Sequence, residues 1–396
     1  MTSTTRPSPD PEAGSIDLDR LRSDRRARCL HEMKVDGLDA VLLGDEANAR
    51  YASGARRLWL AGTRPFVPSC VVMADTGGIH LMTTSDDGVP EDIPRPNLFG
   101  APWNPAGFTT ALRAIPGLGR AGRIGIDGMT PTMATLLARA LPSAEVVDAG
   151  PALARARRIK TPDELVCLGV ALAAAEGALA HALAHLRPGV TEQALYGHFA
   201  QGLGDYGLTI PSVQAGFCVT PRHGADPAPG PRRMSANRVV NATDLVSCDV
   251  GVYYQGYEGT LARTWPCEGA DGGELSDPQR SLHHRWTEAF NAALSACQPG
   301  RAAGDVLDAY RQSGEPLPAM PVLTGLGLGV ETPVVGQGIP PDAGASSILE
   351  AGMVITLGAY VHEEGVGGYL GREAVVIRDD GPHLLTRHSY GPLARP

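Results

Sequence analysis

An acid inside an apolar, β-branched stretch is the residue of this sequence with the clearest capacity for chemistry. Asp249 lies within residues 245–252, Gln255-Gly256 then indicates a turn, and a second strand is expected over residues 257–265. A carboxylate in a buried strand is costly unless it is paired or used. The stretch therefore predicts a β-hairpin whose aspartate either bonds to the backbone or belongs to a functional site.

Alternating strands and helices up to about residue 151 predict an α/β domain in front of this hairpin. A capping residue, a proline and an acid in Thr161-Pro162-Asp163-Glu164 predict the start of a long helix that reaches about residue 186. We expect a tail at residues 1–15, an N-terminal domain at 16–152 and a C-terminal domain at 153–396.

Composition narrows the classes of partner. The 396 residues carry a net charge of −9 without a Lys/Arg-dense stretch, so nucleic acid is not expected as a partner. No apolar run reaches the roughly 20 residues that cross a bilayer, so we expect no membrane partner. The seven cysteines are scattered and show no CxxC pair, which favours reduced thiols and a cytoplasmic location.

An ordered set of short motifs spans residues 150–390. In chain order they are Arg157-x-Ile-Lys160-x-Pro-x-Glu164, Leu186-x-Pro-Gly-Val-Thr-Glu192, Asp244-Leu-Val-x-x-Asp249-x-Gly, Arg263-Thr264, Thr324-Gly-x-Gly-x-Gly329, Leu349-Glu-x-Gly-Met-Val354 and Glu373. This set resembles the creatinase/prolidase/methionine aminopeptidase superfamily. The resemblance implies a creatinase-type α/β N-terminal domain and an α+β C-terminal domain of the pita-bread fold.

The metallopeptidases of that superfamily hold two metal ions with two aspartates, one histidine and two glutamates. The resemblance places Asp249 at the first aspartate and Glu373 at the last glutamate, while Thr260, Leu326 and about Gly358 stand at the other three positions. Two of five ligands are too few for such a centre. We therefore expect no metal and no cofactor.

A rebuilt metal site is the alternative reading of the same region. Glu258 shares a strand face with Thr260 by the two-residue period, and His362 and Glu363 follow Gly358. This reading gives a metallohydrolase similar to Xaa-Pro peptidases.

Creatinase, which cleaves a C–N bond without metal, is the member that the chain resembles most. On this reading Asp249 and Glu373 face each other across a cleft, and one of them holds a proton. His223 lies in the loop where creatinase-like proteins carry their base. In the alternative interpretation both acids are structural. Asp249 then bonds to Thr260 or Tyr257, and Glu373 forms an ion pair with Arg263 or Arg372.

Arginines suggest the charge of the ligand. Besides Arg263 and Arg372, Arg232 replaces a catalytic segment of creatinase, and Arg64 resembles an N-domain arginine that reaches the partner's site in creatinase-like homodimers. Tyr253 lies on the Asp249 face. The expected substrate-binding residues are Arg64, Arg232, Tyr253, Thr260, Arg263, Leu326, His362 and Arg372.

These residues lead to three hypotheses. The first is a metal-independent enzyme in which Asp249, Glu373 and His223 cleave a C–N or similar bond of a small carboxylate by hydrolysis or elimination. The second is a non-catalytic protein that binds a small ligand or peptide, and the third is the rebuilt metallohydrolase. For the chain as a whole we expect a small-molecule substrate and a homodimer in which N-domain residues complete the partner's site.

Overall fold

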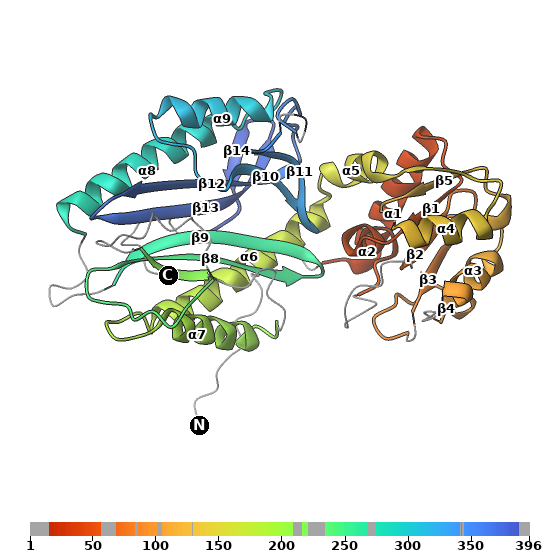
Figure 1. Ribbon diagram of the computed structural model, residues 1–396, viewed down its shortest axis with the longest axis horizontal. Coiled ribbons are helices and arrows are strands. Elements are labelled where there is room, and N and C mark those ends of the chain that lie inside the picture. The colour runs from red at the N-terminus through yellow and green to blue at the C-terminus, as the bar shows by residue number, and fades with distance from the viewer. Residues whose placement is uncertain are drawn as a thin grey trace. The chain divides into compact units, whose positions relative to one another are not determined.

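Two compact units make up the chain (Figure 1). The computed structural model describes residues 16–56, 69–83, 86–100, 105–128, 130–208, 216–220, 234–267, 275–340, 342 and 344–387. The first unit is Asp17–Arg157 and the second continues from Arg158. The division therefore falls near the end of α5 (Gly150–Arg158), a helix that the expected boundary at 152/153 would have cut.

The N-terminal unit is a mixed six-stranded sheet with helices on both faces. Its sheet order is β4-β3-β2-β1-β5-β6. Its elements are α1 (Leu18–Val35), β1 (Ala40–Leu43), α2 (Glu46–Ser53), β2 (Cys70–Met73), β3 (Ile79–Met82), β4 (Leu98–Phe99), α3 (Pro105–Ala114), β5 (Arg123–Ile126), α4 (Pro131–Ala140), β6 (Glu145–Asp148) and α5. Alternate residues of β1 enter two different cores, one with α3 and α4 and one with α1, α2 and α5. This unit is the predicted α/β domain.

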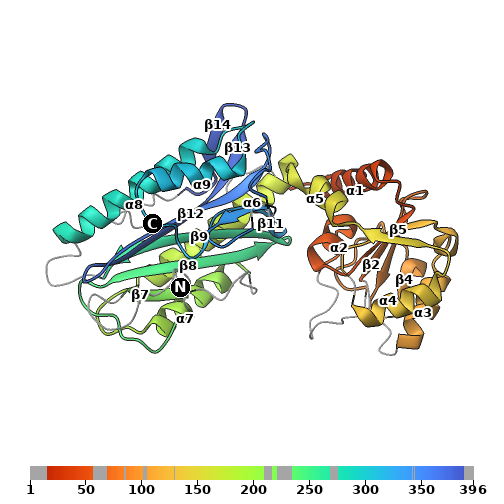
Figure 2. The ribbon, with the colours of Figure 1, turned by 45° about the horizontal axis from the view of Figure 1, so that its top comes forward.

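The C-terminal unit is an eight-stranded sheet with two pairs of helices (Figure 2). Its order is β11-β10-β12-β13-β9-β8-β7, with β14 paired to β13. The strands are β7 (Gly216–Thr220), β8 (Leu245–Tyr254), β9 (Tyr257–Pro266), β10 (Pro321–Gly327), β11 (Gly329–Gly336), β12 (Val354–Glu363), β13 (Gly367–Arg378) and β14 (Gly381–Leu384). The helices are α6 (Pro162–Leu183), α7 (Glu192–Asp205), α8 (Asp277–Ala296) and α9 (Ala303–Gln312).

The predicted hairpin is present as β8 and β9. Tyr254 lies opposite Tyr257, and the two turn residues Gln255 and Gly256 have φ of 49° and 89°. Two consecutive left-handed residues give the turn whose twist matches that of the paired strands. The hairpin places Asp249 opposite Ala262, near the middle of the sheet.

Helix α6 begins with the predicted capping arrangement. The Thr161 hydroxyl accepts a hydrogen bond from the Glu164 backbone N–H at 3.2 Å, and the Thr161 N–H donates to the Glu164 carboxylate at 2.8 Å. The other oxygen of that carboxylate accepts the Tyr257 hydroxyl at 2.8 Å, which ties the first turn of α6 to β9.

Close glycine contacts show which face of the sheet the helices cover. A Cβ on Gly259 of β9 would lie 2.4 Å from the Ala171 carbonyl carbon of α6, and one on Gly371 of β13 would lie 2.1 Å from the Trp286 ring of α8. Arg372 lies opposite Ala262, so these two residues share one face of the sheet. Gly371, one residue before Arg372, and Gly259, three residues before Ala262, both point to the other face. We call this helix-covered face the outer face, and the face that carries Asp249 the inner face.

One observation corrects the sequence reading of apolar runs. By length and composition alone, α6 is a helix that would suffice to cross a membrane, with a mean hydropathy of 1.7, but 56% of that stretch is buried within the protein. Its burial against β8 and β9 is that of a core helix.

Candidate functional site

Strand register places three polar side chains together on the inner face. Asp249 and Thr260 come from the two strands of the hairpin, and Arg372 of β13 lies opposite Ala262, which itself lies opposite Asp249. Because directly paired residues share a face and alternate residues return to it, all three side chains project to the same side of the sheet.

The Arg372 guanidinium joins the other two residues. Its Nη2 donates to a carboxylate oxygen of Asp249 and, at 2.7 Å, to the Thr260 hydroxyl, which donates in turn to the Val250 carbonyl at 3.2 Å. The side chains of Arg372 and Asp249 are only 6% and 7% exposed. The Nε of Arg372 is buried and has no hydrogen-bond partner among the described residues.

Apolar side chains surround this polar group. Ala262, Leu370 and Met320 form a small buried cluster on the inner face, with Tyr360 packed against it. Burial raises the pKa of Tyr360 to about 12. Apolar surroundings lower the local dielectric, so the attraction between Arg372 and Asp249 is stronger than that of an exposed pair.

Glu373 does not face Asp249, which corrects the predicted acid pair. Adjacent strand residues point to opposite faces, so Glu373 lies on the outer face while its neighbour Arg372 lies on the inner one. Its carboxylate is fully buried, 2.8 Å from Nη1 of Arg263, and it accepts the Thr386 hydroxyl. Burial raises the pKa of Glu373, against the opposing effects of Arg263 and Thr386.

Arg263 is likewise an outer-face residue and not a ligand-binding one. Its side chain is 3% exposed, and its Nη1 donates to the carbonyls of Ala262 at 2.8 Å and Arg372 at 3.1 Å. The arrangement of Arg263 with Glu373 is the ion pair that the structural alternative described. It stabilises the packing of the sheet under α6.

The inner-face residues do not fit a two-metal centre. At the five ligand positions the inner face carries Asp249, Thr260, Leu326, Gly358 and, opposite Gly358 on β13, Arg372. A metal ion of this type needs several anionic oxygens and a histidine, and only one of these five positions carries a carboxylate. That carboxylate is already neutralised by a guanidinium.

The proposed replacements do not rebuild the centre within the described part of the chain. Glu258 is buried opposite Tyr253 on the hairpin, and Glu363 bonds to Arg285 at 2.7 Å. His362 lies beside Glu363 near the end of β12, and burial lowers its pKa. These residues belong to no cluster of three potential metal ligands among the described residues.

The remaining expected site residues divide into two groups. Leu326 is fully buried in β10, and Tyr253 is partly exposed on the inner face. His223, Arg64 and Arg232 lie outside the described residues, so their predicted roles stay predictions.

Comparisons with known proteins identify the fold. Residues 167–379, more than half of the 396, match the model described as metallopeptidase family M24, and residues 25–159 match the creatinase/prolidase N-terminal domain. This chain belongs to metallopeptidase family M24. The two-domain pita-bread architecture predicted from the resemblance is thereby confirmed.

Similar proteins agree on this family. An uncharacterized peptidase of Staphylococcus aureus (strain MSSA476) is 27% identical over 240 residues, which cover 59% of this chain and 63% of that protein. Among solved structures, the Xaa-Pro dipeptidase from Bacillus anthracis has a TM-score of 0.74 at 20% identity, covering 93% of this chain and 98% of that one. The X-Pro aminopeptidase from Thermotoga maritima MSB8 has a TM-score of 0.75 at 18% identity, covering 92% and 98%.

Membership of the M24 family corrects the first hypothesis. The family and these relatives are peptidases, so the expected metal-independent enzyme that cleaves small carboxylates by hydrolysis or elimination is wrong. The broader expectation, a protein of a hydrolytic enzyme family, is confirmed.

Proposed function

We propose that this chain binds short peptides on the inner face of its C-terminal sheet. The observation that carries the proposal is the Arg372 guanidinium, a fixed positive charge held by Asp249 and Thr260 where the M24 family implies metal ions. Its buried Nε lacks an acceptor among the described residues, and leaving such a donor unpaired costs about 1–3 kcal/mol. A carbonyl or carboxylate oxygen of a ligand would supply the acceptor.

The surroundings of Arg372 favour a peptide with an apolar residue. Met320, Leu370 and Tyr360 present apolar surface beside the guanidinium, a combination that suits a ligand with one polar oxygen and one apolar side chain. The solved relatives titled Xaa-Pro dipeptidase and X-Pro aminopeptidase make Xaa-Pro dipeptides the first ligands to try.

A metal-dependent peptidase is the second candidate function. The names of the relatives favour it, while the inner-face residues do not. It would need further metal ligands besides Asp249. We also propose a homodimer, in which Arg64 of one subunit contributes to the partner's site.

Calorimetric titration with Ala-Pro tests the binding proposal. The matched variant is Asp249→Asn/Arg372→Met, which removes both charges of the pair without leaving one of them buried alone. We expect binding by the wild type and its loss in this variant. Arg378→Met, on the exposed end of the same strand, should bind as the wild type does.

The outcomes separate the two functions. Equal Ala-Pro binding by the wild type and the neutral double variant, or no binding of Xaa-Pro dipeptides by the wild type, would refute binding through Arg372. Release of proline after addition of Mn²⁺ or Co²⁺, with the activity removed by chelation, would instead establish the peptidase. A Glu258→Gln variant would then show whether that carboxylate serves as a ligand.

A further inference from the structure

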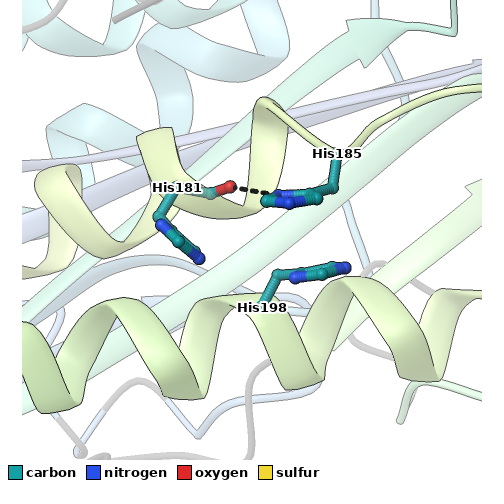
Figure 3. A group of neighbouring side chains, drawn as sticks. All are labelled: His181, His185 and His198. Atoms are coloured by element: carbon teal, nitrogen blue, oxygen red, sulfur yellow. Dashed lines mark hydrogen bonds between the residues drawn. The ribbon is translucent and has the colours of Figure 1, made fainter.

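Three histidines gather where α6 leads into α7, away from the inner face. His181 lies in the last turn of α6, His185 shortly after the helix ends, and His198 on α7. Figure 3 shows the three rings grouped between the two helices. One ring nitrogen of each lies within 4.8 Å of those of the others, and the described residues contain no second cluster of this kind.

Tight packing of α7 against α6 brings these three residues together. His181 and His185 are four residues apart and so share one side of the α6 end. Gly202 lies one turn after His198, and a Cβ there would lie 2.8 Å from the Cα of Ala178 and 3.1 Å from the Cβ of His181. This close approach of α7 to α6 brings His198 beside the other two histidines.

Hydrogen bonds leave ring nitrogens available for a ligand. Nδ1 of His185 lies 3.0 Å from the His181 carbonyl oxygen, so it carries the proton and donates, and Nε2 keeps its lone pair. Nε2 of His181 is buried and has no partner among the described residues. The rings of His185 and His198 stack at 3.6 Å between centroids with planes 8° apart.

We propose that His181, His185 and His198 form a binding site for a divalent transition-metal ion, with Zn²⁺ as the preferred occupant. Neutral imidazole is the commonest metal ligand of proteins, and three histidines with a water molecule make a four-coordinate zinc site. Zinc–nitrogen bonds of about 2.0–2.1 Å in a tetrahedron separate the nitrogens by about 3.3 Å. For all three lone pairs to converge on one ion, the stacked rings of His185 and His198 would have to turn out of their parallel arrangement.

The surroundings allow an ion to enter. All three histidines are partly exposed, so water and ions reach the cluster from the surface. The positive charge of Arg187 acts on His198, but this arginine is exposed and its repulsion is screened. The site lies on the helix pair and is separate from the Asp249–Arg372 pair, so it goes beyond the proposed peptide binding.

Calorimetric titration of metal-free, tag-free full-length protein with Zn²⁺ tests this site. We expect one equivalent to bind, and Co²⁺ to give the intense visible absorption of a four-coordinate site. Each of His181→Ala, His185→Ala and His198→Ala should weaken Zn²⁺ binding by at least about tenfold, since even partners outside the ligand shell cost that much.

The control is His284→Ala, a histidine of α8 whose side chain is 72% exposed, which should bind as the wild type does. Far-UV circular dichroism confirms that each variant keeps its fold. The proposal is overturned if the wild type takes up no Zn²⁺, or if the three cluster variants bind it as tightly as His284→Ala does.

Discussion

Replacing Arg372 by methionine isolates one charge in the interior of the sheet. The side chain of Asp249, which is 7% exposed, would lose the guanidinium that neutralises it. Removing one partner of a buried ion pair costs about 3–5 kcal/mol, because the other charge stays buried without compensation. We expect that loss in the free energy of unfolding of Arg372→Met.

The complementary variants separate the charge from the packing. Asp249→Asn leaves the Arg372 cation buried and should also destabilise, whereas Asp249→Asn/Arg372→Met removes both charges. Apolar or neutral replacement of a whole buried pair is often neutral or stabilising by about 1–4 kcal/mol. The double variant should therefore be more stable than either single variant. A double-mutant cycle measures the corresponding coupling energy between the two charges directly.

Urea unfolding of the full chain, followed by far-UV circular dichroism, gives these free energies. The dependence of the unfolding free energy on urea concentration must be the same in all variants for these free energies to be compared. Arg378→Met, at an exposed position of β13, should stay within about 0.5 kcal/mol of the wild type. Single variants that lose less than about 1 kcal/mol, or a double variant as unstable as the sum of both, would show that the two charges are not coupled in the folded protein.

Three further perturbations follow from burial and close contact. Burial lowers the pKa of His80, so the unfolded chain binds a proton at this histidine more readily than the folded one, and stability falls as the pH drops from 7 to 5. In thermal unfolding measured over this pH range, His80→Leu should show a smaller change of stability with pH. Cys218 is the one cysteine that is not buried, so it alone should react quickly with a thiol reagent, and Cys218→Ser should abolish that fast phase. Gly259→Ala should unfold at lower urea than the wild type because its Cβ meets the backbone of Ala171, whereas Gly204→Ala, with open space in α7, should be neutral or stabilising by up to about 1 kcal/mol.

The fold was accessible from the sequence because its signals are local. The turn at Gln255-Gly256 and the cap at Thr161 and Glu164 each rest on a few neighbouring residues, and both occur as expected. Ordered motifs along the chain then indicated the two-domain architecture.

The site was predicted less well because it depends on register. Glu373 was expected to face Asp249, but the inner-face position is that of its neighbour Arg372, because one residue along a strand changes the face. The pairing of Arg372 with Ala262 across two strands determines which residue of β13 lies beside Asp249. A pattern of neighbouring residues in the sequence does not reveal this pairing. The four-residue spacing of His181 and His185 is visible in the sequence. The position of His198 beside them depends on how α7 packs against α6.

The cation on the inner face is part of the polypeptide itself. A metal ion dissociates and can be taken up again, whereas Arg372 leaves the inner face only by mutation. A glutamate at position 372 would lie beside Asp249 with no cation between the two carboxylates, and Thr260, Leu326 and Gly358 supply no further anionic ligand. A route that removed Arg372 first would leave Asp249 buried without its counter-charge. Building a metal site on the present inner face would therefore require several coordinated substitutions.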